Sequence, residues 1–369
     1  MKIIQISSYF PPHLGGQENV AREISERLAK KGHQVEVFTS NIGCPKNKQL
    51  KSTKNLKIHY LKSKEFLFTP LIFSLYNNLM KIPQNSIIHV HTSQAYVPEI
   101  VHQVWKKRKI PYIAHVHGDP DPSSIIGKII LNPYKKIFLK RFLKDAKKII
   151  VLTKGYKDLF NKKYSIDKSK IIIVPNGVGD NFFTNNRKRS NIPHLLFVGR
   201  ISIEKNPKRL IESFSLCKSK IILDIVGDGV LLEETNILAN EKGLKNVVFH
   251  GRKTGKDLIK LYQSSNAFIS TSNGEAFPLT VLEAMASRLP IIASNVKGNN
   301  EVVKNVGILV NPPTPENFAK EIDRLFLDKR LYDKLSKQSL EFAKEHTWDR
   351  VIKQIEYLYK DIKNKKGVT

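Results

Sequence analysis

The stretch SNGEAFPLTVLEAMA, residues 272–286, decides the fold of the second half of the chain. It follows a short apolar run, residues 267–271, that is typical of a buried parallel strand. After a turn, Val281 and Met285 recur at helical spacing on one side of a predicted helix. Pro278 suits the first turn of that helix. The stretch therefore predicts a strand, a loop and a helix of an α/β sheet.

Two carboxylates in this stretch are placed where open α/β sheets bind ligands. Glu275 lies in the loop at the carboxyl end of the strand, and Glu283 projects from the following helix. Carboxylates accept hydrogen bonds from sugar hydroxyls, and free amides at a helix start can meet an anion. The same spacing also fits an acid that suits the helix dipole and a solvated glutamate on the helix face.

The stretch resembles the E-x7-E motif of retaining glycosyltransferases of family four, which have the GT-B architecture. Residues 288–294, followed by Gly298 and Glu301, fit the pattern of that family as well. The resemblance covers the C-terminal half closely and the N-terminal half loosely. It implies two Rossmann-like, doubly wound parallel-sheet domains that face each other across a cleft. It also implies transfer of a sugar from a nucleoside-diphosphate sugar to an acceptor hydroxyl, with retention at the anomeric carbon.

Length and composition restrict the class of protein further. A chain of 369 residues predicts two domains, and a hydrophobic fraction of 41% excludes disorder. Cys44 and Cys217 form neither a zinc motif nor a disulfide framework, which favours a reducing cytoplasm. The chain opens on a predicted strand, so we expect no signal peptide. The most apolar segment, residues 66–80, is too short and too polar to span a bilayer.

The net charge of +29 is concentrated in the first half of the chain. Residues 1–190 hold 34 Lys and Arg against 12 Asp and Glu, whereas residues 191–369 hold 28 against 21. Such a surface favours an anionic partner, which could be a membrane lipid, a phosphorylated acceptor or nucleic acid. A lysine-rich composition that serves solubility explains the charge equally well. The basic runs lack interleaved stacking aromatics and a known reading module, so we expect no nucleic-acid partner.

Residues 125–148 are the strongest candidate for contact with a membrane. They carry eight Lys and Arg and one acid, with apolar residues in between. A basic amphipathic helix can lie on an anionic leaflet, but a surface helix packed on a sheet has the same pattern. The aromatic run at residues 66–68 is a second candidate. We therefore expect a cytoplasmic protein that can attach to the inner face of the cell membrane, with a glycan or a lipid-linked acceptor.

The first half begins with a βαβ pattern. A strand at residues 2–7 leads to a loop with Gly15-Gly16, a helix with Val20, Ile24 and Leu28 at intervals of four, and a strand at residues 34–38. Glycines at a helix start let the backbone approach a phosphate, although two glycines also make an ordinary turn. Four further strands are predicted, at residues 87–91, 112–116, 148–152 and 171–174.

His117 follows the predicted strand at residues 112–116 and so faces the ligand edge of the first sheet. A histidine there can donate a hydrogen bond to a sugar hydroxyl or stabilise developing charge. The nearby Asp119-Pro120-Asp121 formally matches the Asp-x-Asp metal motif of another glycosyltransferase fold. Aspartates are common in proline-rich turns, and the family resemblance implies no catalytic metal and no cofactor. We therefore expect no metal at Asp119.

In the second half, a strand at residues 194–198 leads into Gly199, Arg200 and Lys205. The planar fork of arginine and the point charge of lysine together suit a diphosphate, although a charged surface loop is the alternative. Arg252 follows a later strand in a loop that lies beside the nucleobase in the family. The resemblance also places Ala276, Phe277 and Leu279 in the donor-binding loop. Pro278 departs from the frequent glycines of the family and removes one N–H donor.

The predicted domains are residues 1–185, a linker at 186–192, residues 193–348, and a last helix at about 349–369 that completes the first domain. The resemblance assigns ribose to Glu283, the donor sugar to Glu275 and His117, and the diphosphate to Arg200, Lys205 and the Gly15-Gly16 amides. The donor could carry UDP, GDP or ADP. Two alternatives stay open at this point: a sugar-nucleotide epimerase on the same fold, and a non-enzymatic protein that binds polyanions.

Overall fold

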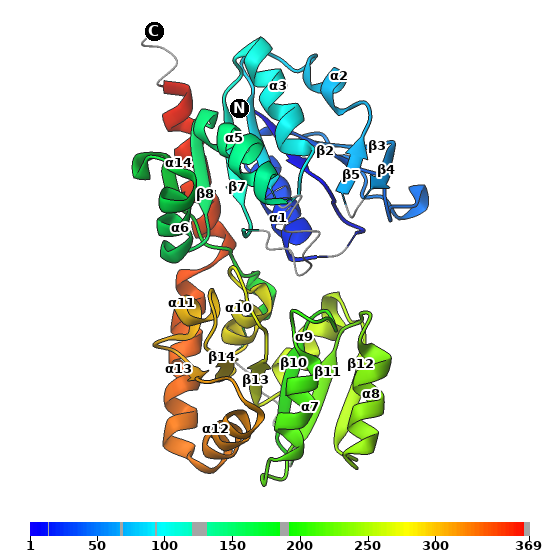
Figure 1. Cartoon of the computed structure of the whole chain (residues 1–369), viewed down its shortest axis with the longest axis vertical. Helices are drawn as coiled ribbons and strands as arrows, with labels where there is room; N and C mark the ends of the chain where they lie inside the picture. Colours follow the sequence, from blue (N-terminus) through cyan, green and yellow to red (C-terminus); the bar gives the residue numbers. More distant parts are fainter. Residues whose placement is uncertain (14, 67–68, 93, 120–130, 185–191, 365–369) are drawn as a thin grey trace. The chain divides into compact units, whose positions relative to one another are not determined.

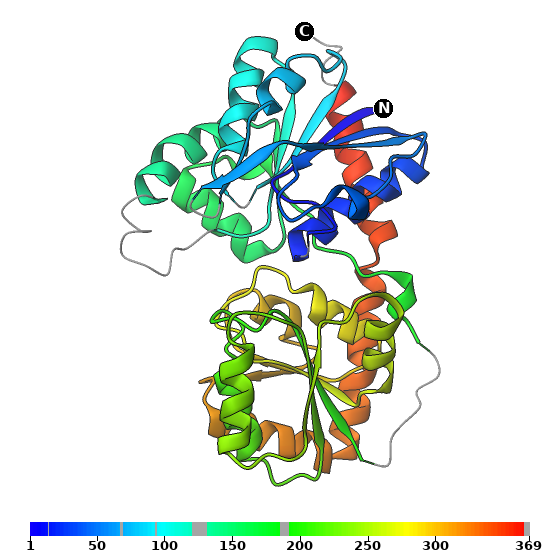
Figure 2. The ribbon, with the colours of Figure 1, turned by 90° about the vertical axis from the view of Figure 1, so that its right-hand side faces the viewer.

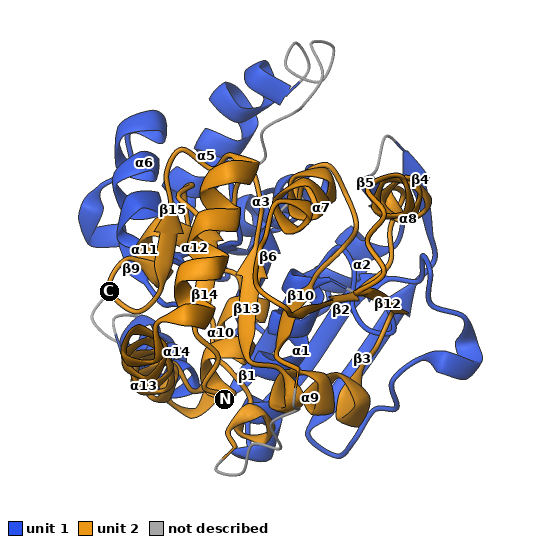
Figure 3. Ribbon diagram, turned by 90° about the horizontal axis from the view of Figure 1, so that it is seen from below, with its two compact units in different colours: residues 1–175, 351–369 blue, residues 176–350 orange. Residues whose placement is uncertain are grey.

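Two parallel sheets organise the chain (Figure 1). The computed structural model describes residues 1–364 except 14, 67–68, 93, 120–130 and 185–191. The chain divides into two compact units, coloured separately in Figure 3. Unit 1 comprises residues 1–175 and 351–369, and unit 2 comprises residues 176–350. The doubly wound α/β architecture predicted from the sequence is confirmed in both units.

Unit 1 contains a seven-stranded parallel sheet with the order β3-β2-β1-β6-β7-β8-β9. The strands are β1 (Lys2–Ser7), β2 (Gln34–Ser40), β3 (Leu56–Leu61), β6 (Ile87–Thr92), β7 (Tyr112–Val116), β8 (Lys148–Val151) and β9 (Ile171–Ile173). An antiparallel hairpin of β4 (Ser63–Phe66) and β5 (Thr69–Ile72) follows β3. The sequence predicted every parallel strand except β3, whose alternation of polar and apolar residues suits an edge strand exposed on one face.

Helices cover both faces of the sheet in unit 1 (Figure 2). The helical segments are α1 (Gly16–Lys30), α2 (Leu75–Leu79), α3 (Val97–Arg108), a π-helical segment η2 (Lys135–Leu139), α5 (Lys140–Asp145), α6 (Lys154–Tyr164) and α14 (Trp348–Asn364). Glu356 of α14 accepts hydrogen bonds from Lys31 and His33 at 2.8 Å each, beside the end of α1. The stripe predicted for α1 is fully buried. Helix α14 therefore forms part of the core layer of unit 1, although it is remote in sequence.

Unit 2 contains a six-stranded parallel sheet with the order β12-β11-β10-β13-β14-β15. The strands are β10 (His194–Val198), β11 (Ile222–Val226), β12 (Val247–Gly251), β13 (Ala267–Ser270), β14 (Ile291–Ser294) and β15 (Ile308–Val310). Its helices are α7 (Pro207–Ser215), α8 (Leu232–Glu241), α9 (Gly255–Ser264), α10 (Leu279–Ala286), α11 (Asn299–Val303), α12 (Pro315–Leu327) and α13 (Lys329–Glu345). This is the Rossmann strand order. Strands β11 and β12 lie on one side of β10, and β13 to β15 lie on the other side, so the switch point is between β10 and β13.

The segment after β9 belongs to unit 2, so the division falls at Pro175–Asn176, before the predicted domain end at residue 185. Asn176 donates a hydrogen bond to the Phe277 carbonyl at 2.9 Å, and Ser287 donates one to the Phe182 carbonyl at 3.0 Å. These contacts fix residues 176–184 on unit 2. Residues 186–191 of the predicted linker lie outside the described residues. Among the described residues, no helix combines the length and the apolar character needed to cross a bilayer.

Candidate active site

The strand order of unit 2 brings two loops together at its carboxyl edge. Strands β10 and β13 are neighbours in the sheet, so the loops that follow them begin side by side. Thr271 donates a shared hydrogen bond to the carbonyls of Lys205 at 3.0 Å and Asn206 at 3.1 Å. The backbone N–H of Asn273 donates to the Glu204 carbonyl at 2.8 Å. These bonds fix the positions from which the predicted site residues project.

Lys205 and Glu275 meet between these two loops. The Lys205 ammonium forms a salt bridge with Glu275 Oε1, and Ser272 donates a hydrogen bond to the same oxygen at 2.8 Å. The Glu275 side chain is only 12% exposed, whereas Lys205 is 25% exposed. An ammonium has three N–H donors, so Lys205 retains donors for a second partner. The structure thus brings together two residues that the sequence predicted for different parts of one ligand.

The loop that carries Glu275 is also fixed from the side of α11. The Glu275 N–H donates to the Lys297 carbonyl at 3.1 Å. A Cβ at Gly298, where φ is +85°, would lie 2.2 Å from the Glu275 carbonyl oxygen. Glycine is therefore required at residue 298 both by the backbone conformation and by the close approach of the loop.

Glu283 projects from α10 and contacts a buried tyrosine that the sequence analysis missed. Tyr262 on α9 is fully buried and donates a hydrogen bond to Glu283 Oε2 at 2.8 Å. Burial and the neighbouring carboxylate raise the pKa of Tyr262 well above its ordinary value, so the phenol keeps its proton. Tyr262 therefore orients Glu283. Nothing near residue 262 in the sequence signals this role, because the contact joins α9 to α10.

The glycine-rich turns after β10 and β11 support the exposed Arg200. A Cβ at Gly227, where φ is +152°, would lie 1.8 Å from the Gly199 carbonyl oxygen. The Ile201 N–H donates to the Asp228 carbonyl at 2.9 Å, which joins the two turns. Arg200 is exposed at the end of β10, and Arg252 is exposed just after β12. Both arginines thus lie at the same edge of the sheet as Lys205.

The residues between Glu275 and α10 contribute mainly backbone. Ala276 and Leu279 are half-buried, and Phe277 is 7% exposed with its ring centroid 5.7 Å from that of His346. Pro278 caps the helix in an extended conformation and precedes its first residue, rather than lying in its first turn as the sequence predicted. The difference arises because the prolyl carbonyl accepts the first hydrogen bond of α10, from Leu282 N–H at 3.3 Å. The side chain of Phe277 therefore contributes to packing.

The glycine loop of unit 1 lies beside a carboxylate. Gly15 caps α1 with an extended backbone that any residue can adopt. A Cβ there would lie 2.2 Å from Glu18 Oε2, and the other oxygen of Glu18 is 3.2 Å from His13 Nδ1. The first helical residue is Gly16, as predicted. An anion at these amides would meet the Glu18 charge, which reduces the support for a phosphate site at Gly15-Gly16.

His117 lies just beyond β7, at the carboxyl edge of the unit 1 sheet. Its Nε2 is 2.9 Å from Nδ1 of His91, a residue that is 1% exposed on the neighbouring strand β6. Burial lowers the pKa of His117 to about 3. His117 is therefore a neutral imidazole near pH 7, which can exchange hydrogen bonds but carries no charge to stabilise a leaving group.

Asp119 is occupied by partners within unit 1. Lys135 and Lys163 form salt bridges with its two oxygens, and Tyr164 donates a hydrogen bond at 2.9 Å. Burial alone would raise the pKa of Asp119, but the bonds from Lys163 and Lys135 outweigh it and hold the pKa below its usual range. Asp121 lies outside the described residues. These contacts explain Asp119 structurally, without a metal ligand role.

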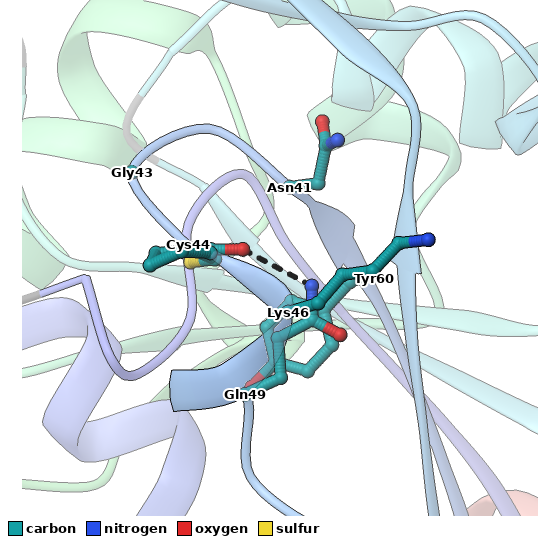
Figure 4. A pocket seen from close by; sticks show the side chains of 7 residues that line it. Asn41, Gly43, Cys44, Lys46, Gln49 and Tyr60 are labelled. Carbon is teal, nitrogen blue, oxygen red and sulfur yellow. Dashed lines mark hydrogen bonds between the residues drawn. The ribbon is translucent and has the colours of Figure 1, made fainter.

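A pocket of about 620 Å³ opens at the same edge of unit 1, beyond the end of β2 (Figure 4). Its lining residues are Asn41, Gly43, Cys44, Pro45, Lys46, Gln49 and Tyr60. Gln49 donates a hydrogen bond to the Cys44 carbonyl at 3.1 Å, and Tyr60 donates one to the Pro11 carbonyl. The pocket therefore combines an aromatic wall with amide groups and one ammonium.

The basic segment of unit 1 is only partly free to contact another molecule. Within residues 131–148, Lys136, Arg141 and Lys144 are exposed, as are Ile137 at 46% and Phe138 at 53%. Lys135 is 3% exposed and holds Asp119 at 3.0 Å. Residues 125–130 lie outside the described residues. The described part presents apolar and basic side chains together, but the buried Lys135 is not among the exposed cations.

Two Rossmann-like domains with polar side chains at the carboxyl edges of their sheets are the architecture of GT-B glycosyltransferases. Solved structures match the chain over nearly its full length. Anabaena HepE in complex with UDP-glucose matches with a TM-score of 0.77 and 16% identity, over 98% of this chain and 100% of that one.

Two family models match adjoining parts of the sequence. The model for Glycosyltransferase Family 4 matches residues 14–182, and the model for Glycosyl transferases group 1 matches residues 179–342. The chain belongs to glycosyltransferase family 4, of the group 1 type, and is an enzyme of the hexosyltransferase type. An uncharacterized glycosyltransferase of Methanocaldococcus jannaschii is 23% identical over 98% of both chains. The Escherichia coli UDP-Gal:alpha-D-GlcNAc-diphosphoundecaprenol alpha-1,3-galactosyltransferase is 27% identical over 70% of this chain and 71% of the relative.

Proposed function

We propose that this glycosyltransferase uses a nucleoside-diphosphate sugar as donor and retains the configuration of the anomeric carbon. The bond from that carbon to the diphosphate oxygen breaks, and the acceptor hydroxyl oxygen bonds to the same face. The proton of the acceptor passes to the leaving diphosphate, so the reaction requires neither a metal ion nor another cofactor. The observation that carries the proposal is the Lys205–Glu275 pair at the switch point of the unit 2 sheet.

Different residues of unit 2 bind different parts of the donor. Glu283, oriented by Tyr262, accepts hydrogen bonds from the ribose hydroxyls, and Glu275 accepts them from the donor sugar. Arg200 and Lys205 stabilise the negative charge that grows on the diphosphate as it leaves, with help from the first N–H groups of α10. Arg252 lies beside the base.

The relatives support this choice of donor and suggest the class of acceptor. HepE binds UDP-glucose in its crystal structure. The Escherichia coli relative is named for a UDP-linked galactose and a diphosphoundecaprenol-linked acceptor. We propose a UDP-linked donor and an acceptor glycan carried on a lipid diphosphate. The pocket beside Tyr60 would hold the acceptor sugar, because aromatic rings and amides suit sugar faces and hydroxyls (Figure 4).

A lipid-borne acceptor implies contact with a membrane surface. The exposed cations and apolar side chains on η2 and α5, and Phe66 at 64% exposure on β4, supply groups for such contact. Each cation near an anionic leaflet is worth about 1 kcal/mol. Sedimentation with vesicles of phosphatidylglycerol and phosphatidylcholine at low salt tests this proposal. Binding should fall with added salt and in Phe138→Ser, and vesicles that leave the protein in the supernatant would contradict it.

A thermal-shift screen tests the donor. UDP, GDP, ADP and their common sugars are compared on the full chain, with Arg200→Ala and Glu283→Gln as variants. A ligand that binds only the folded state raises the melting temperature. We expect a shift with UDP and its sugars that both variants weaken. A shift with GDP or ADP alone would identify guanine or adenine, in place of uracil, as the base of the donor.

The same screen separates this function from its two alternatives. A sugar-nucleotide epimerase would convert the donor without an acceptor, which product analysis by mass spectrometry and NMR reveals. A polyanion-binding protein would bind heparin or oligonucleotides with strong salt dependence and show no shift with any nucleotide at millimolar concentration. Either result would contradict the proposed transfer reaction.

A further inference from the structure

Four histidines, three of them buried, form a cluster on one face of the unit 1 sheet. His89 and His91 lie on β6, His115 lies on β7, and His117 lies just beyond β7. His89, His91 and His115 are at most 2% exposed. Gln5 of β1 and Tyr359 of α14 are also fully buried and complete the cluster. Only His117 lies at the carboxyl edge of the sheet, so the cluster joins that edge to the core.

Hydrogen bonds run through this cluster in one continuous order. His117 Nε2 is 2.9 Å from His91 Nδ1, and His91 Nε2 is 2.8 Å from Gln5 Oε1. Gln5 Nε2 donates to the Tyr359 hydroxyl at 3.2 Å. The chain continues from Tyr359 to His89 Nδ1 at 2.6 Å and from His89 Nε2 to His115 Nδ1 at 3.1 Å. Its far end is His115 Nε2, which has no partner among the described residues.

The cluster does not suit a shared metal ion, although the ring nitrogens of His89, His91 and His115 lie within 4.8 Å of one another. His89 and His91 are stacked, with ring centroids 4.8 Å apart and planes 10° apart. An imidazole binds a metal along a lone pair in its ring plane. Lone pairs in two nearly parallel, separated planes do not meet at one ion. The cluster is therefore a hydrogen-bonded network.

The carbonyl of Gln5 sets the direction of this network. Because Oε1 can only accept, His91 Nε2 carries the proton and its Nδ1 is bare. The bare Nδ1 of His91 then requires His117 to donate from Nε2. A neutral imidazole has one proton, so Nδ1 of His117 is bare as well. Burial keeps all four rings neutral, because it lowers the pKa of His89 and His117 to about 3 and that of His91 and His115 well below 6.5.

The distances favour this direction over the reverse, in which the Gln5 amide is turned. In the reverse order, the Tyr359 hydroxyl would donate to Gln5 across 3.2 Å and His89 N–H would donate to Tyr359 across 2.6 Å. An O–H donor usually lies about 2.7–2.8 Å from its acceptor and an N–H donor about 2.9–3.0 Å. The observed lengths match an amide donor on the long bond and a hydroxyl donor on the short one. Burial also raises the pKa of Tyr359, which keeps its proton in place.

We propose that Gln5, His91 and Tyr359 are positioning residues that hold His117 as its Nε2–H tautomer, so that Nδ1 accepts a hydrogen bond from a sugar hydroxyl. Among the described residues, His117 Nδ1 has no hydrogen-bond partner, so it is available to a ligand. The inference rests on the proposed function for the presence of a sugar. It restricts the group that meets Nδ1 to a hydrogen-bond donor, because a carboxylate at that position could not donate to a bare nitrogen. A sugar hydroxyl at that position fits this requirement and a carboxylate does not.

The tautomer can be measured without any substrate. The full chain is labelled with 15N at histidine, and the ring nitrogens are recorded by two-bond 1H–15N NMR at pH 7. The signals of His117 are assigned by their loss in His117→Asn. We expect a protonated Nε2 and a bare Nδ1 for His117 in the wild type. A His117 with its proton on Nδ1, or a charged His117, would overturn the proposal.

Variants of the network test whether Gln5 and Tyr359 determine the tautomer of His117. Gln5→Leu removes the group that sets the direction, and Tyr359→Phe lets the Gln5 amide turn. Tyr112→Phe is the matched control, because it removes a buried tyrosine hydroxyl of unit 1 whose partner is the Phe142 carbonyl. We expect both tautomers of His117 in the first two variants and one in the control. An unchanged tautomer in every network variant that folds would also overturn the proposal.

Transfer kinetics give the functional counterpart. If half to nine tenths of the molecules hold the other tautomer, kcat/KM falls about twofold to tenfold. The affinity for the free nucleoside diphosphate, which has no sugar, should stay unchanged. A loss of nucleotide affinity in Tyr359→Phe would indicate a general structural defect and contradict the inference. Absence of transfer in the wild type would count against the proposed function alone, since the NMR result does not depend on a substrate.

Discussion

The carboxyl edges of the two sheets are built from different chemistry. The edge of unit 2 carries formal charges: Arg200, Lys205 and Glu275 on loops joined by backbone hydrogen bonds, and Glu283 on α10. The edge of unit 1 presents His117, a neutral ring whose orientation depends on a chain of side chains through the core. Charges suit a ligand part that gains charge during reaction, such as a leaving diphosphate. A neutral ring suits the recognition of hydroxyls, so the two edges have separable roles.

Removing the central cation of unit 2 should have the largest effect. Lys205→Ala deletes a charge that would stabilise the leaving diphosphate and leaves Glu275 without its cation. We expect kcat to fall roughly 100- to 1,000-fold, as for the loss of one preorganised donor. Steady-state kinetics with the donor identified by the thermal-shift screen measure it. Lys208→Ala is the control, because that side chain is 69% exposed on the neighbouring α7. Equal losses of kcat in Lys205→Ala and Lys208→Ala would contradict the specific role of Lys205 at the edge of unit 2.

The loop geometry of unit 2 should be the next most sensitive feature. Gly227→Ala places a Cβ 1.8 Å from the Gly199 carbonyl oxygen at a φ of +152°. We expect a loss of roughly 3 kcal/mol in the free energy of unfolding. Gly243→Ala is the matched control, since φ is +67° but a Cβ would have nothing within 4 Å. That control should lose only about 1 kcal/mol. Urea unfolding of both variants measures the difference, and equal losses would contradict the steric argument.

Acid should destabilise unit 1 through its histidines. The unfolded chain binds protons on these rings as the pH falls through about 6.5, whereas folded His89 and His117 do so only near pH 3. The unfolded state therefore binds more protons between these values, so the free energy of unfolding decreases as the pH is lowered. The expected slope is about 1.4 kcal/mol per pH unit for each such histidine.

Urea unfolding from pH 7 to pH 5, followed through the fluorescence of Trp105 in unit 1, measures this slope. His115→Gln removes one of the four rings and should make the slope shallower. A wild-type stability that does not change across this range would show that the four rings are already charged or already solvated in the folded state.

The smallest effect is expected at Tyr262, which acts on the ligand through Glu283. Tyr262→Phe removes one hydrogen bond to that carboxylate, worth about 1 kcal/mol. The affinity for the nucleoside diphosphate should fall about fivefold by isothermal titration calorimetry. Tyr332→Phe is the control, because it removes the hydrogen bond from Tyr332 to the Asn266 carbonyl, remote from Glu283. An unchanged affinity in Tyr262→Phe would exclude the proposed orientation of Glu283.

The sequence predicts most strands of both sheets because buried parallel strands are short apolar runs, but it did not predict β14 and β15 of unit 2 as strands. The bounds predicted for β7 and β10 agree with the structure at both ends. The edge strand β3 has no such run, so its signal is weaker. The pairing of Lys205 with Glu275 was also beyond the sequence analysis, although both residues were predicted. Seventy positions separate them, and only the adjacency of β10 and β13 brings them together.

The histidine network shows a different limit of sequence analysis. Alternating histidines on a strand predict a shared face, but not which ring donates to which. That depends on Gln5, on Tyr359 and on contacts across the sheet. Tyr262 was missed for the same reason, because its partner lies on another helix. Local patterns therefore indicate which residues reach the carboxyl edge, whereas the side chains that orient them depend on tertiary packing.

Helix α14 has a consequence for the order in which the protein can be built. Residues 351–364 complete the core layer of unit 1, and they are synthesised after all of unit 2. During translation, unit 2 has its whole sequence available in one continuous segment. Unit 1 lacks Tyr359 and Glu356 until α14 has been synthesised. The segment that is synthesised first is therefore completed last.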